Sequence, residues 1–245
     1  MAPSNTALSQ DAPARRRGQT AEADEPAPDR NTPPRQQDDA FTMAQLWSGA
    51  GFIAQAAVVT FALSLSGRVL SQPLSLFSWH PLSQVFGLFL LVQSILVLQP
   101  TRTAAQRRVG QCVHAWLNAA SLVAFAAGFT AVYANKQRNG APHFASNHGA
   151  LGATLTTLLG GQYLVGFAMW VVPALRGRVW RLHRAAGYVS LLLLLATFCT
   201  AADTGFVRNV LRIEAWVFYA PMALVAVGVL PRIQLSKLGF KKRKV

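Results

Sequence analysis

The chain has 245 residues, of which 52% are hydrophobic and only 13% are charged, and its formal net charge is +14. Seven of its nine acidic residues precede Ala40, so Asp203 and Glu214 are the only acids in the remainder. A soluble domain of that size needs surface charge of both signs, so this composition excludes a soluble globular protein and indicates a lipid environment. The basic residues fall in short clusters without a continuous basic face or a nucleic-acid motif, which argues against a nucleic-acid partner.

The amino-terminal segment is rich in Ala, Pro, Gln, Arg and Asp and has no apolar periodicity. It cannot bury enough apolar surface to offset the loss of chain entropy. We therefore expect residues 1–43 to be a disordered cytoplasmic tail, without a cleavable signal peptide. A membrane domain over residues 44–232 and a basic cytoplasmic tail over residues 233–245 are expected to follow.

Six apolar runs are each long enough to cross a hydrocarbon layer of about 30 Å, which takes roughly 20 helical residues. They cover residues 46–65, 77–98, 110–134, 149–175, 185–202 and 213–230. Turn-forming or polar segments separate them, among them residues 99–101, 139–142, 176–178 and 203–205. We therefore predict an all-α membrane protein, a bundle of six transmembrane helices within the lipid bilayer.

Basic residues are unevenly divided between the two sides of this bundle. An even number of spans puts both chain ends on one side, which carries Arg102, Arg107, Arg108, Arg176, Arg178, Arg181 and the basic cluster at residues 241–244. The opposite side carries Arg68, Lys136, Arg138, Arg208 and Arg212. By the positive-inside rule, both termini of this multi-pass protein are predicted to be cytoplasmic.

Four of the five histidines recur at intervals of 34, 34 and 35 residues: His80, His114, His148 and His183. Each stands near the predicted beginning of a successive span, and successive spans run in opposite directions. His80 and His148 are therefore expected towards the non-cytoplasmic side, and His114 and His183 towards the cytoplasm. The spacing thus predicts two histidine pairs, stacked along the membrane normal.

Polar side chains at membrane depth are costly unless they face the bundle interior and have partners. Axial ligation of haem iron by two imidazoles supplies such a partner, and helix bundles often hold such cofactors. Gly152 and Gly187 each follow their histidine by four residues, so they lie on the same helix face and leave room for a flat ring. Asn118 takes the corresponding position in the third span.

The four histidines also allow other interpretations. A single interfacial histidine more often makes an ordinary hydrogen bond or faces lipid headgroups, but four at one spacing are harder to explain in that way. Zinc fits less well, because the pairs lie in two layers with no thiolate or carboxylate beside either. A haem-free carrier or scaffold, and a haem-containing redox partner subunit without its own turnover, stay open as alternative functions.

Four sequence strings, in this order and at these spacings, resemble the cytochrome b561 family. They are SWHP at residues 78–81, HAWLN at 114–118, HFASNHGALG at 143–152 and LHRAAGY at 182–188. The resemblance implies a six-helix bundle whose central four helices hold two haem b groups. It also implies that His80 pairs with His148, and His114 with His183, as the helix directions require.

The chain looks most like the core-only branch of this family, since no extracellular β-sandwich domain precedes the core. That resemblance implies a transmembrane oxidoreductase that takes electrons from cytoplasmic ascorbate and reduces monodehydroascorbate or a ferric chelate outside. A homodimer is a further candidate assembly. One stretch departs from the family: the lysine and aliphatic-basic motif near the cytoplasmic end of span two is replaced by LVLQPTRTAAQRR. Arg107 and Arg108 could there serve an anionic donor.

Two further positions are candidate substrate contacts. The resemblance suggests that His143 lies near an external substrate patch, beside Lys136 and Arg138, and packing of an exposed loop histidine against Phe144 is an equally good interpretation. Arg181, next to the inner ligand, could meet the donor or the haem propionates, or could simply anchor the helix at the cytoplasmic interface. Gly160 and Gly161 are expected to allow close helix contact.

Overall fold

The computed structural model describes residues 49–99, 101 and 103–232. The predicted tails, and the first residues of the predicted membrane domain, lie outside the described residues. Within the described part, every regular element is a helix, which confirms the all-α prediction. The α-helices are α1 (Ala50–Leu70), α2 (Trp79–Leu96), α3 (Ala104–Arg138), α4 (Asn147–Val171), α5 (Pro173–Ala201) and α6 (Trp216–Val229). Shorter turns are the 3₁₀ segments η3 (Leu76–Ser78) and η5 (Leu230–Arg232) and the π-helical η4 (Phe206–Leu211).

Four helical segments in the described residues are long and apolar enough to cross a membrane: α1, η3 with α2, α3 and α5. The chain is therefore an integral membrane protein. Helix α4 is not among these four, and the hydroxyls of its three threonines donate to carbonyls four residues earlier at 2.8–3.1 Å. Helix α6 has 14 residues and so rises by about 21 Å, less than a hydrocarbon core of about 30 Å.

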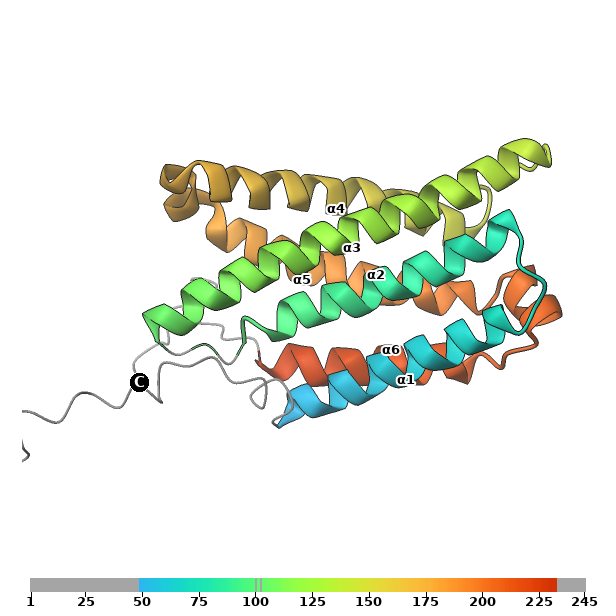
Figure 1. The fold of residues 1–245 in the computed structure, drawn as a ribbon, viewed down its shortest axis with the longest axis horizontal. Helices are drawn as coiled ribbons and strands as arrows, with labels where there is room; N and C mark the ends of the chain where they lie inside the picture. Colours follow the sequence, from blue (N-terminus) through green and yellow to red (C-terminus); the bar gives the residue numbers. More distant parts are fainter. Residues whose placement is uncertain (1–48, 100, 102, 233–245) are drawn as a thin grey trace, which may run out of the picture. The chain divides into compact units, whose positions relative to one another are not determined.

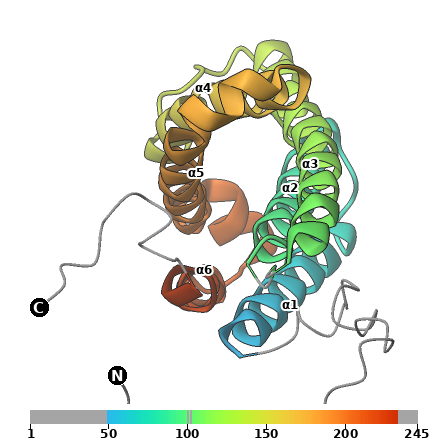
Figure 2. The ribbon, with the colours of Figure 1, turned by 90° about the vertical axis from the view of Figure 1, so that its left-hand side faces the viewer.

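Successive α-helices run in opposite directions, as Figure 1 shows. Viewed along the helices, they follow one another around a ring that α6 closes by packing against α1 (Figure 2). The tightest neighbours are α2 with α3, α4 with α5, and α1 with α6. The pair α2–α3 thus stands across the ring from α4–α5, and these four helices carry the four recurring histidines.

The best-packed apolar core lies on the side of the ring formed by α1, α2, α5 and α6. Phe61 of α1 is edge-on to Phe198 of α5 and to Phe218 of α6, with ring centroids 5.8 and 5.3 Å away. Such aromatic pairs contribute roughly 0.5–1.5 kcal/mol beyond burial alone. At Gly228 of α6, an added Cβ would lie 2.6 Å from the Cβ of Ala54, so small residues bring α1 and α6 together.

Helices α3 and α5 begin earlier than the apolar pattern indicated. Helix α3 starts after Thr103, whose Oγ1 accepts the backbone N–H of Gln106 at 3.2 Å while the Gln106 side chain accepts the N–H of Thr103 at 3.3 Å. This reciprocal cap begins the helix six residues before the predicted Gly110. His114 is consequently the eleventh residue of its helix.

The predicted turn at residues 176–178 is wrong, because those residues lie inside α5. The chain turns instead at Val172, which has φ −119° and ψ 88° and precedes Pro173, the first residue of α5. Proline disfavours helical geometry in the residue before it and is well suited to open a helix. His183 is thus also the eleventh residue of its helix, whereas His80 and His148 are each the second.

The expected role of Gly160 and Gly161 in close helix contact is also wrong. A Cβ added at either position would meet no described atom within 4 Å. The close approaches occur at Gly87 and Gly128, where an added Cβ would lie 2.6 Å from Phe125 and from Gln84, respectively. Gly87 and Gly128 thus tighten the α2–α3 contact.

Candidate cofactor site

His80 of α2 and His148 of α4 face each other across the ring of helices. Their imidazole centroids are 6.1 Å apart, and the ring planes are inclined at 79°. A transition metal binds an imidazole nitrogen at about 2.0–2.1 Å, so a metal held between two imidazoles leaves their centroids roughly 6 Å apart. The pair therefore has the spacing needed to hold one iron atom from both sides.

Each of these imidazoles is fixed through its Nδ1 atom. Nδ1 of His80 lies 3.0 Å from the backbone oxygen of Gly128, and Nδ1 of His148 lies 3.0 Å from that of Thr197. A carbonyl oxygen can only accept, so in both rings Nδ1 carries the proton and Nε2 keeps a free lone pair. This is the outer hydrogen bond that typically orients a metal-binding histidine.

His114 of α3 and His183 of α5 are the residues of the second predicted pair. Nδ1 of His114 lies 2.8 Å from the backbone oxygen of Ser94, which repeats the arrangement of the first pair. His183 lies near enough to His114 for the two to interact electrostatically. Its own Nδ1 meets the side-chain amide of Gln162, at 2.8 Å.

The same spacing along the sequence recurs in the contacts of all four histidines. In each of the four helices, the residue fourteen positions after the histidine contacts the histidine of the tightly packed neighbouring helix. These residues are Ser94 in α2, Gly128 in α3, Gln162 in α4 and Thr197 in α5. Fourteen helical residues rise by about 21 Å, so the two histidine levels are separated by roughly that distance along the helices.

The other predicted cofactor contacts lie beside the histidines. Nδ2 of Asn118 donates to the backbone oxygen of His114 at 2.8 Å and lies 3.3 Å from both ring nitrogens. An added Cβ at Gly152 would meet only a methyl group of Thr197, at 3.9 Å, and one at Gly187 would meet no described atom within 4 Å. These positions are therefore free of bulky side chains, as a flat macrocycle requires.

A bare metal ion fits this arrangement poorly. Among the described residues, no three His, Cys, Asp or Glu side chains gather in a way that could hold a metal ion. Protein zinc sites use three or four such ligands, whereas haem iron needs only axial ones because its ring supplies the rest. Two imidazoles per level, with an uncrowded helix face beside them, fit a haem.

The predicted donor-binding arginines lie in the amino-terminal parts of α3 and α5, the ends that the sequence predicts to be cytoplasmic. Arg107 is exposed, and its Nε donates to the backbone oxygen of Thr103 at 3.2 Å, within the first turn of α3. Arg108 beside it is exposed as well. The exposed Arg181 places its guanidinium carbon 5.6 Å from the ring centroid of Trp180. Arg107 and Arg181 are thus each held by their own helix.

His143 lies in the connection between α3 and α4. Its ring stacks on Tyr133, with centroids 4.3 Å apart, and is tilted against Phe144 at 5.9 Å. Its Nε2 lies 3.3 Å from Oε1 of Gln137. Lys136 donates to the backbone oxygen of Pro142 at 2.7 Å and is close enough to His148 to interact with it electrostatically. The connection therefore gathers aromatic and basic groups near His148.

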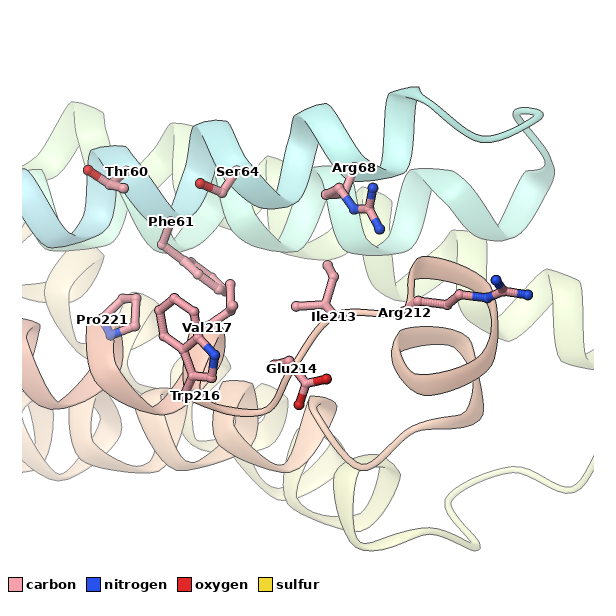
Figure 3. Close-up of a pocket in the computed structure, with 10 residues that line it drawn as sticks. All are labelled: Thr60, Phe61, Ser64, Arg68, Arg212, Ile213, Glu214, Trp216, Val217 and Pro221. Atoms are coloured by element: carbon pink, nitrogen blue, oxygen red, sulfur yellow. The ribbon is translucent and has the colours of Figure 1, made fainter.

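A separate groove of about 400 Å³ lies between α1 and the segment that leads into α6 (Figure 3). Phe61, Trp216 and Val217 line it, and Arg68 reaches across it from α1. Nη2 of Arg68 donates to the backbone oxygen of Leu211 at 2.6 Å, so this charge already has a polar partner. The lining residues include none of the four histidines, and we assign the groove no part in the cofactor site.

Helical packing and paired imidazoles define a class: integral membrane proteins built to hold haem between their helices. The chain belongs to the eukaryotic cytochrome b561 family, whose match covers residues 79–208, from α2 to within η4. This stretch contains all four recurring histidines, and membership of the family implies haem b.

Curated relatives agree with this assignment. Over 128 residues, 49% of this chain and 44% of the relative, the chain is 29% identical to the plasma membrane ascorbate-dependent reductase CYBRD1 of Mus musculus. Over 126 residues, 49% of this chain and 50% of the relative, it is 32% identical to the transmembrane ascorbate-dependent reductase CYB561 of Ovis aries. Over 100 residues, 40% of this chain and 39% of the relative, it is 28% identical to the lysosomal membrane ascorbate-dependent ferrireductase CYB561A3 of Rattus norvegicus. The matched stretches span half or less of each relative.

Proposed function

We propose that this protein is a transmembrane cytochrome with two haem b groups, which passes electrons from a cytoplasmic donor to a non-cytoplasmic acceptor. His80 and His148 would be the axial ligands of the outer haem, and His114 and His183 those of the inner one. The observation that carries this proposal is that the imidazoles of His80 and His148 face each other with their ring centroids 6.1 Å apart. The Nδ1 atom of each ring is hydrogen-bonded to a backbone carbonyl. A bis-imidazole haem supplies reversible one-electron chemistry at each level.

The proposal requires all six α-helices to cross the bilayer. Helices α4 and α5 pack tightly against each other, and the hydroxyls of Thr154, Thr156 and Thr157 are satisfied within α4. These three hydroxyls therefore do not need water. Helix α6 is extended by η5 at one end, and residues 212–215 link it to η4 at the other. These features support α4 and α6 as membrane-crossing helices.

The chain's own part is to bind and orient the cofactors and to keep water away from them. Backbone carbonyls fix the tautomer of three imidazoles, and the helices hold the two levels about 21 Å apart along their axes. If the two haem irons are separated by a distance of that order, the edges of the two haem rings are closer to each other than the irons are. Transfer between the levels then needs no large movement of the protein.

The names of the relatives support ascorbate as the donor. An anionic donor fits the cytoplasmic ends of α3 and α5, where Arg107, Arg108 and Arg181 are exposed. For the acceptor we propose monodehydroascorbate or a ferric chelate, reduced near the connection that carries His143 and Lys136. Both the chelate and the ascorbate radical are one-electron acceptors, as this chemistry requires.

The test is a reduced-minus-oxidised spectrum of the purified full chain, combined with haem and protein quantification. The proposal predicts sharp reduced bands of bis-imidazole haem b, two haems per chain, and reduction by ascorbate. A haem-free carrier or scaffold would show no such bands. If ascorbate reduces the haems but no external acceptor is then reduced by the protein, the result would instead indicate a redox partner subunit.

A further inference from the structure

The groove between α1 and the segment that leads into α6 is charged at one end and mostly apolar along the rest of its length (Figure 3). Arg68 and Arg212 lie towards the charged end, and Phe61 and Pro221 lie towards the other. From Phe61 to Arg68, α1 rises by about 10 Å, compared with about 15 Å of hydrocarbon in one leaflet. The groove therefore changes from polar to apolar over a depth similar to that of a leaflet.

The groove is open on the surface of the helix bundle. Thr60 and Ser64 of α1 are exposed, and Trp216 of α6 is 68% exposed. In a bilayer, exposed surface of this kind meets acyl chains, because water is absent from the hydrocarbon region. An unfilled groove of about 400 Å³ would forfeit the dispersion contacts of its lining, so an acyl chain is the occupant that the environment supplies.

Arg212, at the charged end, has a backbone conformation that residues with side chains rarely adopt. Its φ of 51° and ψ of 48° are left-handed, and Phe144 is the only other non-glycine among the described residues with a positive φ. The backbone nitrogen of Ile213 donates to the backbone oxygen of Val207 at 3.2 Å, a helix ending that normally selects glycine at the left-handed position. An arginine stands there at a conformational cost, which points to a role for its guanidinium.

Two opposite charges near this end, Arg212 and Glu214, have no ion-pair partner among the described residues. The ion pair within the same connection joins Asp203 and Arg208. Arg212 and Glu214 stand two residues apart, and both side chains are exposed, so both can turn towards a bound headgroup. A cation and an anion so close in the chain complement a zwitterionic headgroup, with phosphate for the one and ammonium for the other.

We propose that this groove binds one phospholipid of the phosphatidylethanolamine type, with an acyl chain along Phe61 and Pro221. The guanidinium of Arg212 binds the lipid phosphate, and the carboxylate of Glu214 accepts an N–H of the headgroup ammonium. A choline headgroup has no N–H to donate, so the carboxylate favours ethanolamine. The site includes none of the four recurring histidines, and it does not depend on the proposed haem function.

The experiment measures lipid binding to the purified full chain by native mass spectrometry in detergent. The probes are phosphatidylethanolamine, phosphatidylcholine and phosphatidylglycerol with identical acyl chains. One saturable site per chain is expected, which binds phosphatidylethanolamine at least about threefold more tightly than the other two lipids. Glu214→Gln should abolish that preference, and Arg212→Gly should weaken the binding of all three lipids by a similar factor.

Arg212→Gly also separates a lipid-binding role from a structural one. Glycine is favoured at a left-handed helix end, so the unfolding midpoint in lipid-free detergent should be unchanged or higher while lipid affinity falls. Arg138→Gln is the matched control, because it removes an exposed charge in the last turn of α3, which does not line the groove. Ser64→Trp fills the groove from an exposed position and should weaken lipid binding as well.

The absence of a saturable site, or wild-type lipid affinity in Arg212→Gly, would overturn the inference. So would a preference for phosphatidylethanolamine that survives in Glu214→Gln, or a lowered unfolding midpoint in Arg212→Gly, which would indicate a structural role. A wild-type dimer that Ser64→Trp dissociates would show that the groove is an interface between two copies of the chain and that the lipid inference is wrong.

Discussion

At the scale of single residues, the imidazoles of His80, His114 and His148 are oriented by backbone oxygens of the helices packed against them. Backbone oxygens of Ser94, Gly128 and Thr197 belong to rigid helices, so they can hold a ring at low entropic cost. A helix carbonyl is normally engaged four residues along, and it accepts the imidazole N–H through its second lone pair. Such a site is sensitive to small helix displacements.

Gly128→Ala should therefore disturb the outer haem site selectively. The added methyl would lie 2.6 Å from Nε2 of Gln84 and 3.1 Å from the backbone oxygen of His80. The flexible Gln84 amide can move, but the backbone of α2 cannot, so we expect a destabilisation of about 1–3 kcal/mol and loss of haem mainly from the outer level. Haem stoichiometry and the thermal unfolding midpoint measure both effects.

Gly67→Ala is the control for that substitution. Gly67 lies in the last turn of α1, where an added Cβ would meet no described atom within 4 Å. Alanine should there leave the haem content unchanged. Equal haem loss in the two variants would show that the α2–α3 contact is not what positions His80.

His143 can be tested for a role in acceptor reduction. If the external acceptor docks at the connection between α3 and α4, His143→Ala should slow reduction of a ferric chelate severalfold and leave reduction of the haems by cytoplasmic ascorbate unchanged. Stopped-flow measurements of the two half-reactions separate these rates. Loss of the ring stack on Tyr133, with a lower unfolding midpoint and unaltered rates, would support the packing interpretation instead.

The sequence identifies some of these site residues and not others. The four histidines stand out because their residue type and spacing are unusual in apolar helices. Ser94, Gly128 and Thr197 act through backbone oxygens, which every residue has, so no side-chain pattern points to them. Gln162 could have been noticed as an amide within an apolar run at fourteen residues after His148, but its orientation towards α5 depends on packing.

At the scale of whole elements, α3 and α5 both begin about ten residues before their histidines, at the end predicted to be cytoplasmic. The apolar pattern misses these extensions because charged residues interrupt it, although helix formation does not require apolar side chains. Residues 176–178 were predicted as a turn from their glycine and charges, whereas the real break follows from Pro173. The helices and their order could be predicted; their polar ends depend on caps and proline geometry.

These extensions carry the proposed donor site, and charge neutralisation tests it. Replacing Arg107, Arg108 and Arg181 together by glutamine should slow reduction by ascorbate, because the attraction for an anion is lost. The difference between variant and wild type should shrink at high salt, since exposed charges are screened over about 8–10 Å. Initial rates of haem reduction at several ionic strengths measure it.

The control for this experiment is Arg138→Gln, which removes an exposed charge in the last turn of α3, at the opposite end. It should not alter reduction by ascorbate from the cytoplasmic side. If the triple variant kept the wild-type rate at every salt concentration, these arginines would be interfacial anchors only.

At the scale of the molecule, the antiparallel order of the helices makes topology testable. With six crossings and the basic clusters on one side, both chain ends should face the cytoplasm. A cysteine introduced after Val245 should therefore be protected from an impermeant thiol reagent in intact cells and become reactive when the membrane is opened. Labelling in intact cells would contradict this prediction, and would mean either that the orientation is reversed or that the number of crossings is not six.

The ring of helices also predicts that the histidines act as two separable pairs. His148→Ala should remove mainly the outer haem, His183→Ala mainly the inner one, and either variant should lose transmembrane electron transfer because a single centre cannot span the layer. Only the His183 variant should lose fast reduction by cytoplasmic ascorbate, since the inner level faces that side. Adding His80→Ala to His148→Ala should cost little further haem, because residues that act as a unit are non-additive. Haem stoichiometry and stopped-flow reduction in vesicles measure these effects. Retention of two haems in His148→Ala would refute the pairing, and so would the loss of different haems in the His80 and His148 single variants.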